Sequence, residues 1–258
     1  MTDYDGFRLE QDDSRGVAVV TLDVPGKHNR VSMRARDELG RLFGELGRDA
    51  EVDAIVLTGA GDSFTAGGDV AGFLEASPEE LSRLAWNVAA PERCPKPVVA
   101  KLRGYCFGVG LELALACDFR VAADDVELAL PEVKLGMIPG SGGTQRLARL
   151  VGLGRAKDLI MRGRRVGAEE ARALGIVTEV VAADALDAAV DGLIDELRAL
   201  SPLALAVAKQ VLNQAHEGPL HLGLEVEGLA YGFLRTSADF EEGVTAFLEK
   251  RQPRFEGR

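Results

Sequence analysis

The sequence is poor in the residues from which metal centres and catalytic triads are usually built. Histidine occurs only three times among 258 residues, at His28, His216 and His221. These positions are scattered, and Ser141, in the glycine-rich run GSGGT, has no histidine motif beside it. A serine nucleophile activated by histidine is therefore not indicated, and surface or capping roles are the simpler interpretation of the histidines. No metal site is expected.

Cysteine is equally scarce, and long apolar runs are missing. Cys94, Cys106 and Cys117 are odd in number and lack metal-like spacing, so we expect reduced core thiols in a cytoplasmic protein. The opening stretch, MTDYDGFRLEQDD, is acidic and has no apolar core. Neither a secretory signal nor a membrane-spanning segment is therefore predicted.

Basic residues are outnumbered by acidic ones. The chain has 30 Lys and Arg against 41 Asp and Glu, a net charge of −11 at pH 7. This charge disfavours nucleic acid and anionic membranes as partners. It does not exclude an anionic small ligand, because local basic side chains and backbone N–H groups can hold phosphates. The 47% of hydrophobic residues is typical of a soluble globular protein of one or two domains.

Short apolar strands alternate with helices in the first half of the chain, which predicts an α/β fold. The strands are spaced by roughly forty residues, as in repeat architectures, and each leads into a polar or glycine-rich turn. Helices are predicted at the apolar stripe around Phe43 and over residues 79–89. The predicted strands are residues 17–22, 54–58, 97–102, 119–122 and 126–130.

Beyond residue 143 the pattern becomes largely helical. Ser201 and Pro202 should begin a helix, because serine is a good N-cap and proline suits the first helical position. No linker rich in proline, glycine or serine precedes it. The other predicted elements are helices over residues 144–151, 154–161, 168–174 and 186–200, and a last strand over residues 176–181.

Two carboxylates lie in apolar sequence within residues 104–144. Glu112 stands between leucines in a predicted helix, and Glu132 stands in LALPEV, at the end of a predicted short strand. Burial disfavours the charged form of a carboxyl group and raises its pKa. Such acids are either structural, as ion pairs or helix caps, or a pair tuned for proton transfer. The residues alone leave both interpretations open.

Two turns of small residues could serve the same chemistry. Residues 108–110, Gly-Val-Gly, open the helix of Glu112, so free backbone N–H groups and the positive end of the helix dipole face that turn. Residues 64–69, FTAGGD, form a second such turn. Each could donate one N–H to a developing oxyanion. Taken singly, each is most simply a turn, and residues 108–110 lack the third glycine of a dinucleotide site.

Several runs together resemble the crotonase superfamily, also called the enoyl-CoA hydratase/isomerase family. FTAGGD (64–69), GYCFGVGLELALACD (104–118) and PEVKLGMIPGSGGTQRL (131–147) occur in the family's order and spacing, and PGKHNRVS and FLEKRQPRF match its opening and closing motifs. The resemblance implies a spiral of repeated β-β-α units over residues 1–200, carrying the acyl-CoA site. It also implies a C-terminal helical trimerisation region over residues 201–258, which gives homotrimers or homohexamers.

The resemblance also implies a site. Glu112 and Glu132 match the catalytic glutamates, and the backbone N–H groups of Gly68 and Val109 match those that hold the thioester oxygen. Val109 stands where the family usually has glycine, and a β-branched residue is poorly suited to positive φ and would crowd the thioester. The residues implied to contact coenzyme A, the last two from a neighbouring subunit, are Lys27, Ala66, Asp69, Val70, Tyr231 and Lys250. Asp69 is equally well interpreted as a cap of the helix that follows it.

The implied activity is hydration of a 2-enoyl-CoA to a 3-hydroxyacyl-CoA, with Glu112 as base and Glu132 as acid. No metal or redox cofactor is implied, since coenzyme A is part of the substrate. A Δ3,Δ2-enoyl-CoA isomerase, which needs only Glu132, and reactions on cyclic, aromatic or branched acyl-CoA esters are the alternatives. The acidic surface and both intact glutamates argue against a non-catalytic or RNA-binding relative. The expected walls of the acyl pocket are Phe73, Leu74, Leu81, Leu84, Trp86 and residues 137–138.

Overall fold

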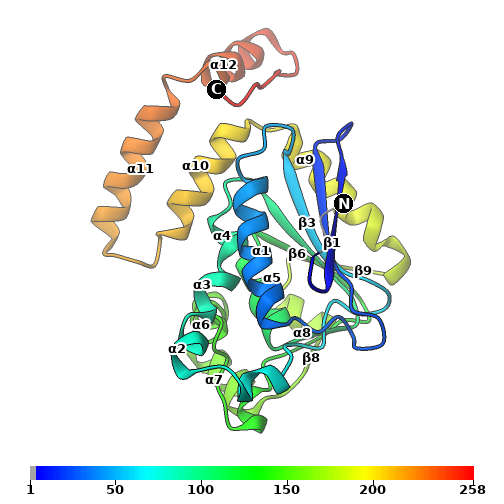
Figure 1. Ribbon diagram of the computed structural model, residues 1–258. Coiled ribbons are helices and arrows are strands. Elements are labelled where there is room, and N and C mark those ends of the chain that lie inside the picture. Colours follow the sequence, from blue (N-terminus) through cyan, green and yellow to red (C-terminus); the bar gives the residue numbers. More distant parts are fainter. Residues whose placement is uncertain (1–3) are drawn as a thin grey trace.

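A mostly parallel sheet of six strands forms the frame of the protein. In the computed structural model, which describes residues 4–258, the strand order is β1-β2-β3-β4-β6-β9 (Figure 1). Only β1 runs antiparallel to its neighbour. The first three residues of the acidic opening stretch lie outside the described part. The strands are β1 Phe7–Asp12, β2 Val17–Leu22, β3 Ala54–Gly59, β4 Val98–Leu102, β6 Phe119–Ala123 and β9 Glu179–Val181.

Both faces of this sheet are covered, because alternate strand residues point to opposite sides. Val20 and Leu57 belong to the core shared with α1 (Met33–Leu46), while Val56 and Val99 pack with α9 (Leu186–Arg198). The predicted stripe of α1 is buried, and the Oγ of its N-cap Ser32 accepts the Ala35 N–H at 2.9 Å. The burial of both faces explains why the strands read as continuous apolar runs.

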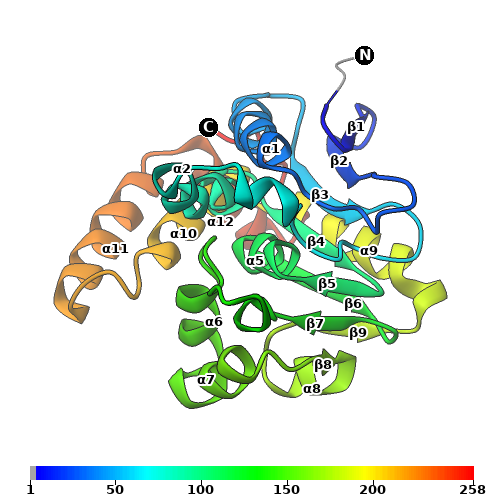
Figure 2. The same ribbon diagram turned by 60° about the horizontal axis from the view of Figure 1, so that its bottom comes forward.

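A second, three-stranded sheet places the glycine-rich turns. It consists of β5 (Tyr105–Phe107), β7 (Glu127–Ala129) and β8 (Val166–Gly167), and it lies beside the main sheet, toward α6 (Gly143–Val151) and α8 (Ala168–Ala173) (Figure 2). Successive units follow one pattern, since β4 and β5 lead into α5 (Val109–Ala116), and β6 and β7 lead into η2 (Glu132–Leu135) and α6. This arrangement confirms the predicted α/β spiral of β-β-α units.

Three local predictions were wrong. The helix expected over residues 79–89 is broken into α2 (Pro78–Ser82), α3 (Leu84–Val88) and α4 (Ala90–Arg93), with tight i→i−3 bonds such as Trp86 N–H to Arg83 O at the joints. The last strand begins only at Glu179, because Ile176 N–H bonds back to Ala171 at the end of α8. Glu132 does not end a strand but begins the 3-10 helix η2.

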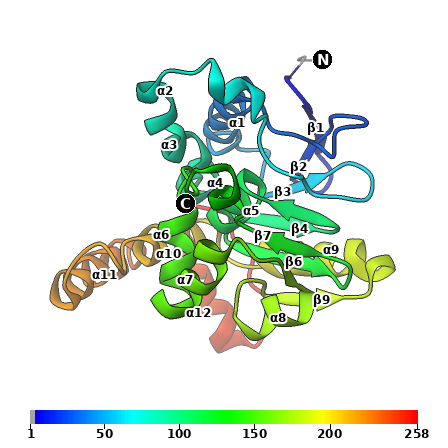
Figure 3. The same ribbon diagram turned by 90° about the horizontal axis from the view of Figure 1, so that it is seen from below.

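The carboxyl-terminal helices leave the body of the molecule. They are α10 (Pro202–Asn213), α11 (Leu220–Leu234) and α12 (Ala238–Glu249), whereas α7 (Leu153–Arg162) directly follows α6 earlier in the chain. Ser201 caps α10 as predicted. Lys209 anchors α10, since its Nζ donates to Asp118 Oδ2 at 2.7 Å and to the carbonyl oxygens of Pro91 and Lys96. Helix α11 extends outward (Figures 1 and 3).

Helix α11 buries none of its own side chains within residues 4–258, although it is rich in apolar residues. Leu220, Leu229 and Tyr231 expose 78%, 77% and 69% of their surface. Leu220 and Tyr231 lie on one side of the helix and Leu229 on the opposite side, so apolar side chains are exposed all round α11, which is typical of a helix that contacts other chains. No helix among the described residues combines the length and the apolar character needed to cross a membrane.

Helix α5 lies close to the turn of residues 64–69 because it carries glycine at its second position. A Cβ on Gly110 would stand 2.4 Å from Thr65 Cγ2 and 3.3 Å from Thr65 O, and Thr65 is fully buried. Only glycine therefore allows the helix to approach this segment so closely.

We expect Gly110→Ala to lower the free energy of unfolding by about 1–3 kcal/mol, because the added methyl group overpacks a buried contact. The matched control is Gly192→Ala in α9, where no atom lies within 4 Å of the added Cβ, and it should stabilise by about 0.5–1 kcal/mol. Urea unfolding of both variants at one protein concentration tests this. Equal effects of the two substitutions would contradict the close contact.

Candidate active site

Glu112 is held in the first turn of α5 by the loop that precedes α6. Its side chain is 2% exposed, and its Oε1 accepts the backbone N–H groups of Ser141 at 2.7 Å and Gly143 at 2.9 Å. A Cβ on Gly143 would lie 3.0 Å from both Glu112 Cγ and Oε1, so the glycine makes this approach possible. The carboxylate thus caps the start of α6.

Glu132 begins η2 after β7, and its side chain lies against the turn at Gly108 that opens α5. Its Oε2 is buried and finds no hydrogen-bond partner among the described residues. A Cβ on Gly108, whose φ is +54°, would lie 3.2 Å from Glu132 Oε1. The turn is fixed because Gly108 N–H donates to Ala129 O at 2.9 Å, which ties the end of β5 to the end of β7. The fold therefore places Glu132 against the turn that opens the helix of Glu112.

The two carboxyl groups have different electrostatic surroundings. The pKa of Glu132 is raised from 4.5 to about 7, mainly by burial and also by the nearby charge of Glu112, against the opposing effects of its own N–H and of Arg36. Burial also raises the pKa of Glu112, but the N–H groups of Gly143 and Ser141 oppose this by stabilising the ionised form. Both carboxyl groups therefore have a raised pKa, and two backbone N–H groups stabilise the ionised form of Glu112 where Glu132 has only its own.

The two N–H groups expected to hold a thioester oxygen lie on neighbouring segments. Thr65 pairs with Cys106 of β5, and Phe107 N–H donates to Thr65 O at 3.0 Å, so residues 64–68 run beside the strand that leads to Val109. Neither the Gly68 nor the Val109 N–H donates to an acceptor within residues 4–258. Both donors are therefore available for a ligand.

The expectation that positive φ at residue 109 would strain a valine was wrong. The positive φ falls on Gly108, the N-cap, and Val109 is the first residue of the helix proper. The Val109 side chain is 3% exposed and packs in the main core instead of crowding the turn. Valine at this position therefore keeps the backbone donor without a conformational penalty.

The sequence interpretation missed Arg36. It projects from α1, is 3% exposed, and its Nη1 donates to Ser141 Oγ at 3.2 Å. The guanidinium carbon lies 5.3 Å from the centre of the Phe73 ring, and a Cβ on Gly68 would stand 2.6 Å from Arg36 Nη2. Its signal in the sequence is a basic residue on the apolar stripe of α1, three positions before Leu39.

Four of the residues implied to contact coenzyme A come from adjoining segments. Lys27 is exposed on the loop before α1, and the Ala66 N–H donates to His28 O at 2.9 Å. Asp69 forms an ion pair with Arg30 at 3.2 Å. It does not cap the following helix η1 (Ala71–Leu74), whose N-cap is the 45% exposed Val70.

The other two implied contacts lie elsewhere. Tyr231 is on α11 and Lys250 ends α12, and both helices stand across the molecule from the loop between β2 and α1 (Figure 1). One chain therefore does not bring all six residues together. Whether Tyr231 and Lys250 reach the coenzyme A of a neighbouring subunit stays a prediction.

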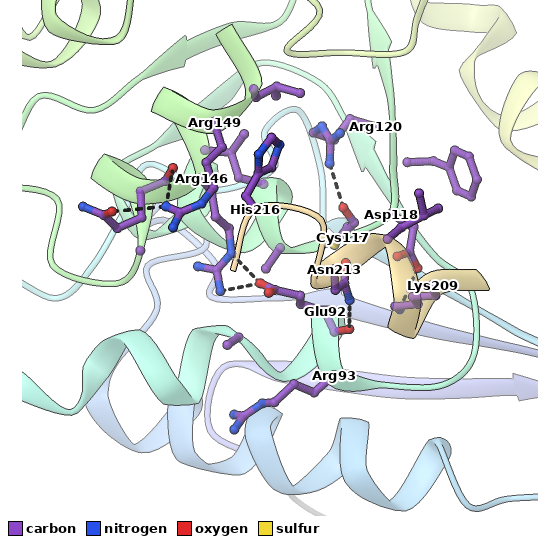
Figure 4. Close-up of a pocket in the computed structure, with 18 of the residues that line it drawn as sticks. Glu92, Arg93, Cys117, Asp118, Arg120, Arg146, Arg149, Lys209, Asn213 and His216 are labelled. Atoms are coloured by element: carbon purple, nitrogen blue, oxygen red, sulfur yellow. Dashed lines mark hydrogen bonds and ion pairs between the residues drawn. The ribbon is translucent and has the colours of Figure 1, made fainter. Parts of the chain in front are cut away.

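A cavity of about 770 Å³ lies between α10 and helices α3 to α6. Two of its cations already have carboxylate partners, Lys209 with Asp118 and Arg146 with Glu92 (Figure 4). Trp86, expected in the acyl pocket, lines this cavity, but neither catalytic candidate does. Of the other expected walls, Leu84 is buried in the protein, and Leu74 and Ile138 are largely exposed.

These features agree with the comparison to known proteins, which shows that the chain belongs to the enoyl-CoA hydratase/isomerase family; the family's model matches residues 12–258. It is 36% identical to the short-chain-enoyl-CoA hydratase of Clostridium acetobutylicum over 92% of both chains. It is 35% identical to the crotonyl-CoA hydratase of Syntrophomonas wolfei over 98% of both. A crystal structure of enoyl-CoA hydratase from Bacillus anthracis superposes with a TM-score of 0.92 at 35% identity, covering 98% of this chain and all of that one.

Glu132→Gln should make the protein more stable at pH 8 than the wild type, by about 1–3 kcal/mol. The folded state holds the Glu132 proton up to a pKa of about 7, while the unfolded chain releases it near 4.5, so wild-type stability falls as pH rises through this window. The glutamine variant has no proton to lose, and its advantage should vanish below pH 4.5. Urea unfolding at several pH values measures this, and an equal gain at pH 4 and pH 8 would contradict the raised pKa.

Proposed function

We propose that the protein is an enoyl-CoA hydratase that adds water across the C2=C3 double bond of a 2-enoyl-CoA to give a 3-hydroxyacyl-CoA. The observation that carries this proposal is the asymmetric carboxylate pair, Glu112 and Glu132, beside the glycine turn at Gly108. Hydration needs a base for water and an acid for carbon, which is the division that these two environments support. The names of the two relatives direct the first test to short acyl chains.

Glu112 and Glu132 together hold the attacking water in this mechanism. Glu112 takes a proton from the water as its oxygen attacks C3, because two backbone donors stabilise the carboxylate form before the reaction. Glu132 gives its proton to C2, since a pKa of about 7 keeps it partly protonated at neutral pH. One proton enters Glu112 and one leaves Glu132 in each turnover, so the pair returns to its starting state by proton exchange.

Negative charge moves onto the thioester oxygen as water attacks C3. The N–H groups of Gly68 and Val109 are proposed to hold that oxygen, and the positive end of α5 adds to their effect. A donor of this kind is typically worth about 3 kcal/mol of transition-state stabilisation. The two N–H groups lie on different segments, so they can hold one oxygen only because residues 64–68 pair with β5.

Coenzyme A is part of the substrate, and no metal or redox cofactor is proposed. Lys27 would meet its phosphates, and residues 66–70, which include Ala66, Asp69 and Val70, would wrap its adenine. Tyr231 and Lys250 would act from a neighbouring subunit. Arg30 neutralises Asp69 in an ion pair, so the exposed Lys27 leaves this surface with local positive charge within an acidic protein.

A Δ3,Δ2-enoyl-CoA isomerase is the alternative. One observation favours it: Glu112 is already bound by two backbone donors, while Glu132 keeps a free oxygen that could shuttle a proton between C2 and C4. Hydration and isomerisation differ in their need for Glu112. An enzyme that converts a 3-enoyl-CoA at an unchanged rate after Glu112→Gln would be an isomerase.

The protein is further proposed to form homotrimers or homohexamers through residues 201–258. The exposed apolar side chains around α11 support a contact with another copy of this chain. A cytoplasmic location is proposed because Cys94, Cys106 and Cys117 are all free and buried.

We expect the protein to remove the conjugated thioester absorbance of crotonyl-CoA, and Glu112→Gln and Glu132→Gln each to lower kcat by at least about 100-fold, because each variant lacks one proton-transfer group. Binding of the product thioester, measured by calorimetry, should persist in both variants and control for folding. A wild type that binds crotonyl-CoA without hydrating it would contradict the proposed activity.

Leu229→Glu should reduce the oligomer to smaller species, because it places a charge among the exposed apolar side chains of α11. The control is Leu153→Glu on α7, an exposed leucine on a different surface. Sedimentation velocity of the two variants and the wild type measures the effect. A monomeric wild type at micromolar concentration would contradict the assembly.

A further inference from the structure

Arg36 is a buried cation that the hydration mechanism does not use. Its guanidinium contacts three separate segments: the loop of Ser141, the ring of Phe73 and the turn of Gly68. The Ser141 loop binds the candidate base Glu112, and the Gly68 turn carries one of the two proposed oxyanion donors. An arginine at their junction can therefore act on both halves of the site.

The guanidinium is only partly satisfied. Its Nε is buried without a hydrogen-bond partner in the described chain, and no carboxylate within residues 4–258 forms a direct ion pair with Arg36. Such a cation is costly to bury, and well-packed apolar residues often replace one without loss of stability. Packing alone therefore does not explain why α1 carries an arginine on its apolar stripe.

The charges that face Arg36 are those of the catalytic pair. Burial lowers the pKa of Arg36, and the negative charge of Glu112 opposes this most strongly, followed by that of Glu132 and then that of Asp37. In the opposite direction, Arg36 lowers the pKa of both glutamates. The loop before α6 contributes uncharged donors to Glu112, namely the N–H groups of Ser141 and Gly143.

We propose that Arg36 is a positioning residue, which holds Ser141 against Glu112 and supplies the positive charge that the two glutamates share. The path is short: Arg36 Nη1 donates to Ser141 Oγ at 3.2 Å, and Ser141 N–H donates to Glu112 Oε1 at 2.7 Å. The proposal rests on the hydratase function proposed above. In that reaction Arg36 favours the ionised form of the base without touching the substrate's reacting carbons.

The first experiment compares pH profiles of kcat/KM for crotonyl-CoA in Arg36→Met, Arg36→Lys and Ser141→Ala. The wild-type profile should be bell-shaped. Loss of the charge in Arg36→Met should move both of its limbs to higher pH by about one unit and lower kcat/KM at pH 6 roughly tenfold. Arg36→Lys should keep both limbs near their wild-type positions. Ser141→Ala keeps the charge, so only the acidic limb, which reports Glu112, should move.

Thermal unfolding separates this role from a structural one. The melting temperature of Arg36→Met should equal or exceed that of the wild type, because the variant no longer buries a partly unpaired charge. A large fall in melting temperature together with an unshifted pH profile would overturn the proposal, since Arg36 would then serve only the packing of α1.

Isotope-edited infrared titration of the glutamate carboxyl groups, without substrate, makes the test independent of activity. Bands assigned through Glu112→Gln and Glu132→Gln should titrate at higher pH in Arg36→Met than in the wild type. If they do while the wild type fails to hydrate crotonyl-CoA, the hydratase function fails and the role of Arg36 stands. If the wild type hydrates crotonyl-CoA but neither titration nor pH profile changes, the role of Arg36 is refuted.

Discussion

The hydrogen bonds from Ser141 and Gly143 to Glu112 are the contact on which the site depends. They join α5, which ends one β-β-α unit, to the start of α6, which follows the next unit. A buried carboxylate without such donors would be too costly to keep ionised. With them, the same oxygen caps a helix and holds the side chain in one place. The structural interpretation of Glu112 as a helix cap is therefore confirmed, and in the proposed mechanism the same hydrogen bonds would prepare the base.

Glycines set the distances in this site by leaving out side chains. Gly108 leaves room for Glu132, Gly110 lets α5 approach Thr65, and Gly143 lets its N–H reach Glu112. A Cβ would clash with Thr65 at Gly110 and would crowd the glutamate side chains at Gly108 and Gly143, so these glycines mark close contacts as well as turns. The result is a compact group of two acids, one buried arginine and two free N–H groups.

The same site is open at its edges. Lys27, Ala66, Asp69 and Val70 lie on one surface, whereas Tyr231 and Lys250 lie on helices that leave the body (Figure 1). The apolar side chains around α11 remain exposed in the single chain.

The sequence by itself determined β2, β3, β4 and β6 of the main sheet, the order of the β-β-α units and the positions of the two glutamates, but not β1. These follow from local signals, because buried parallel strands are continuous apolar runs and the motif residues are contiguous in the chain. It also placed the start of α10 at Ser201, since an N-cap acts within one turn. The division into residues 1–200 and 201–258 stays a prediction.

Only the tertiary structure decided the rest. The position of positive φ at Gly108 instead of Val109, the breaks between α2, α3 and α4, and the short extent of β9 depend on hydrogen bonds and packing that a local pattern does not contain. Arg36 is the clearest case, because its partner Ser141 is 105 residues away in the chain. Its importance arises where three distant segments meet, and such a meeting point is set by the packing of the whole fold and not by any single stretch of sequence.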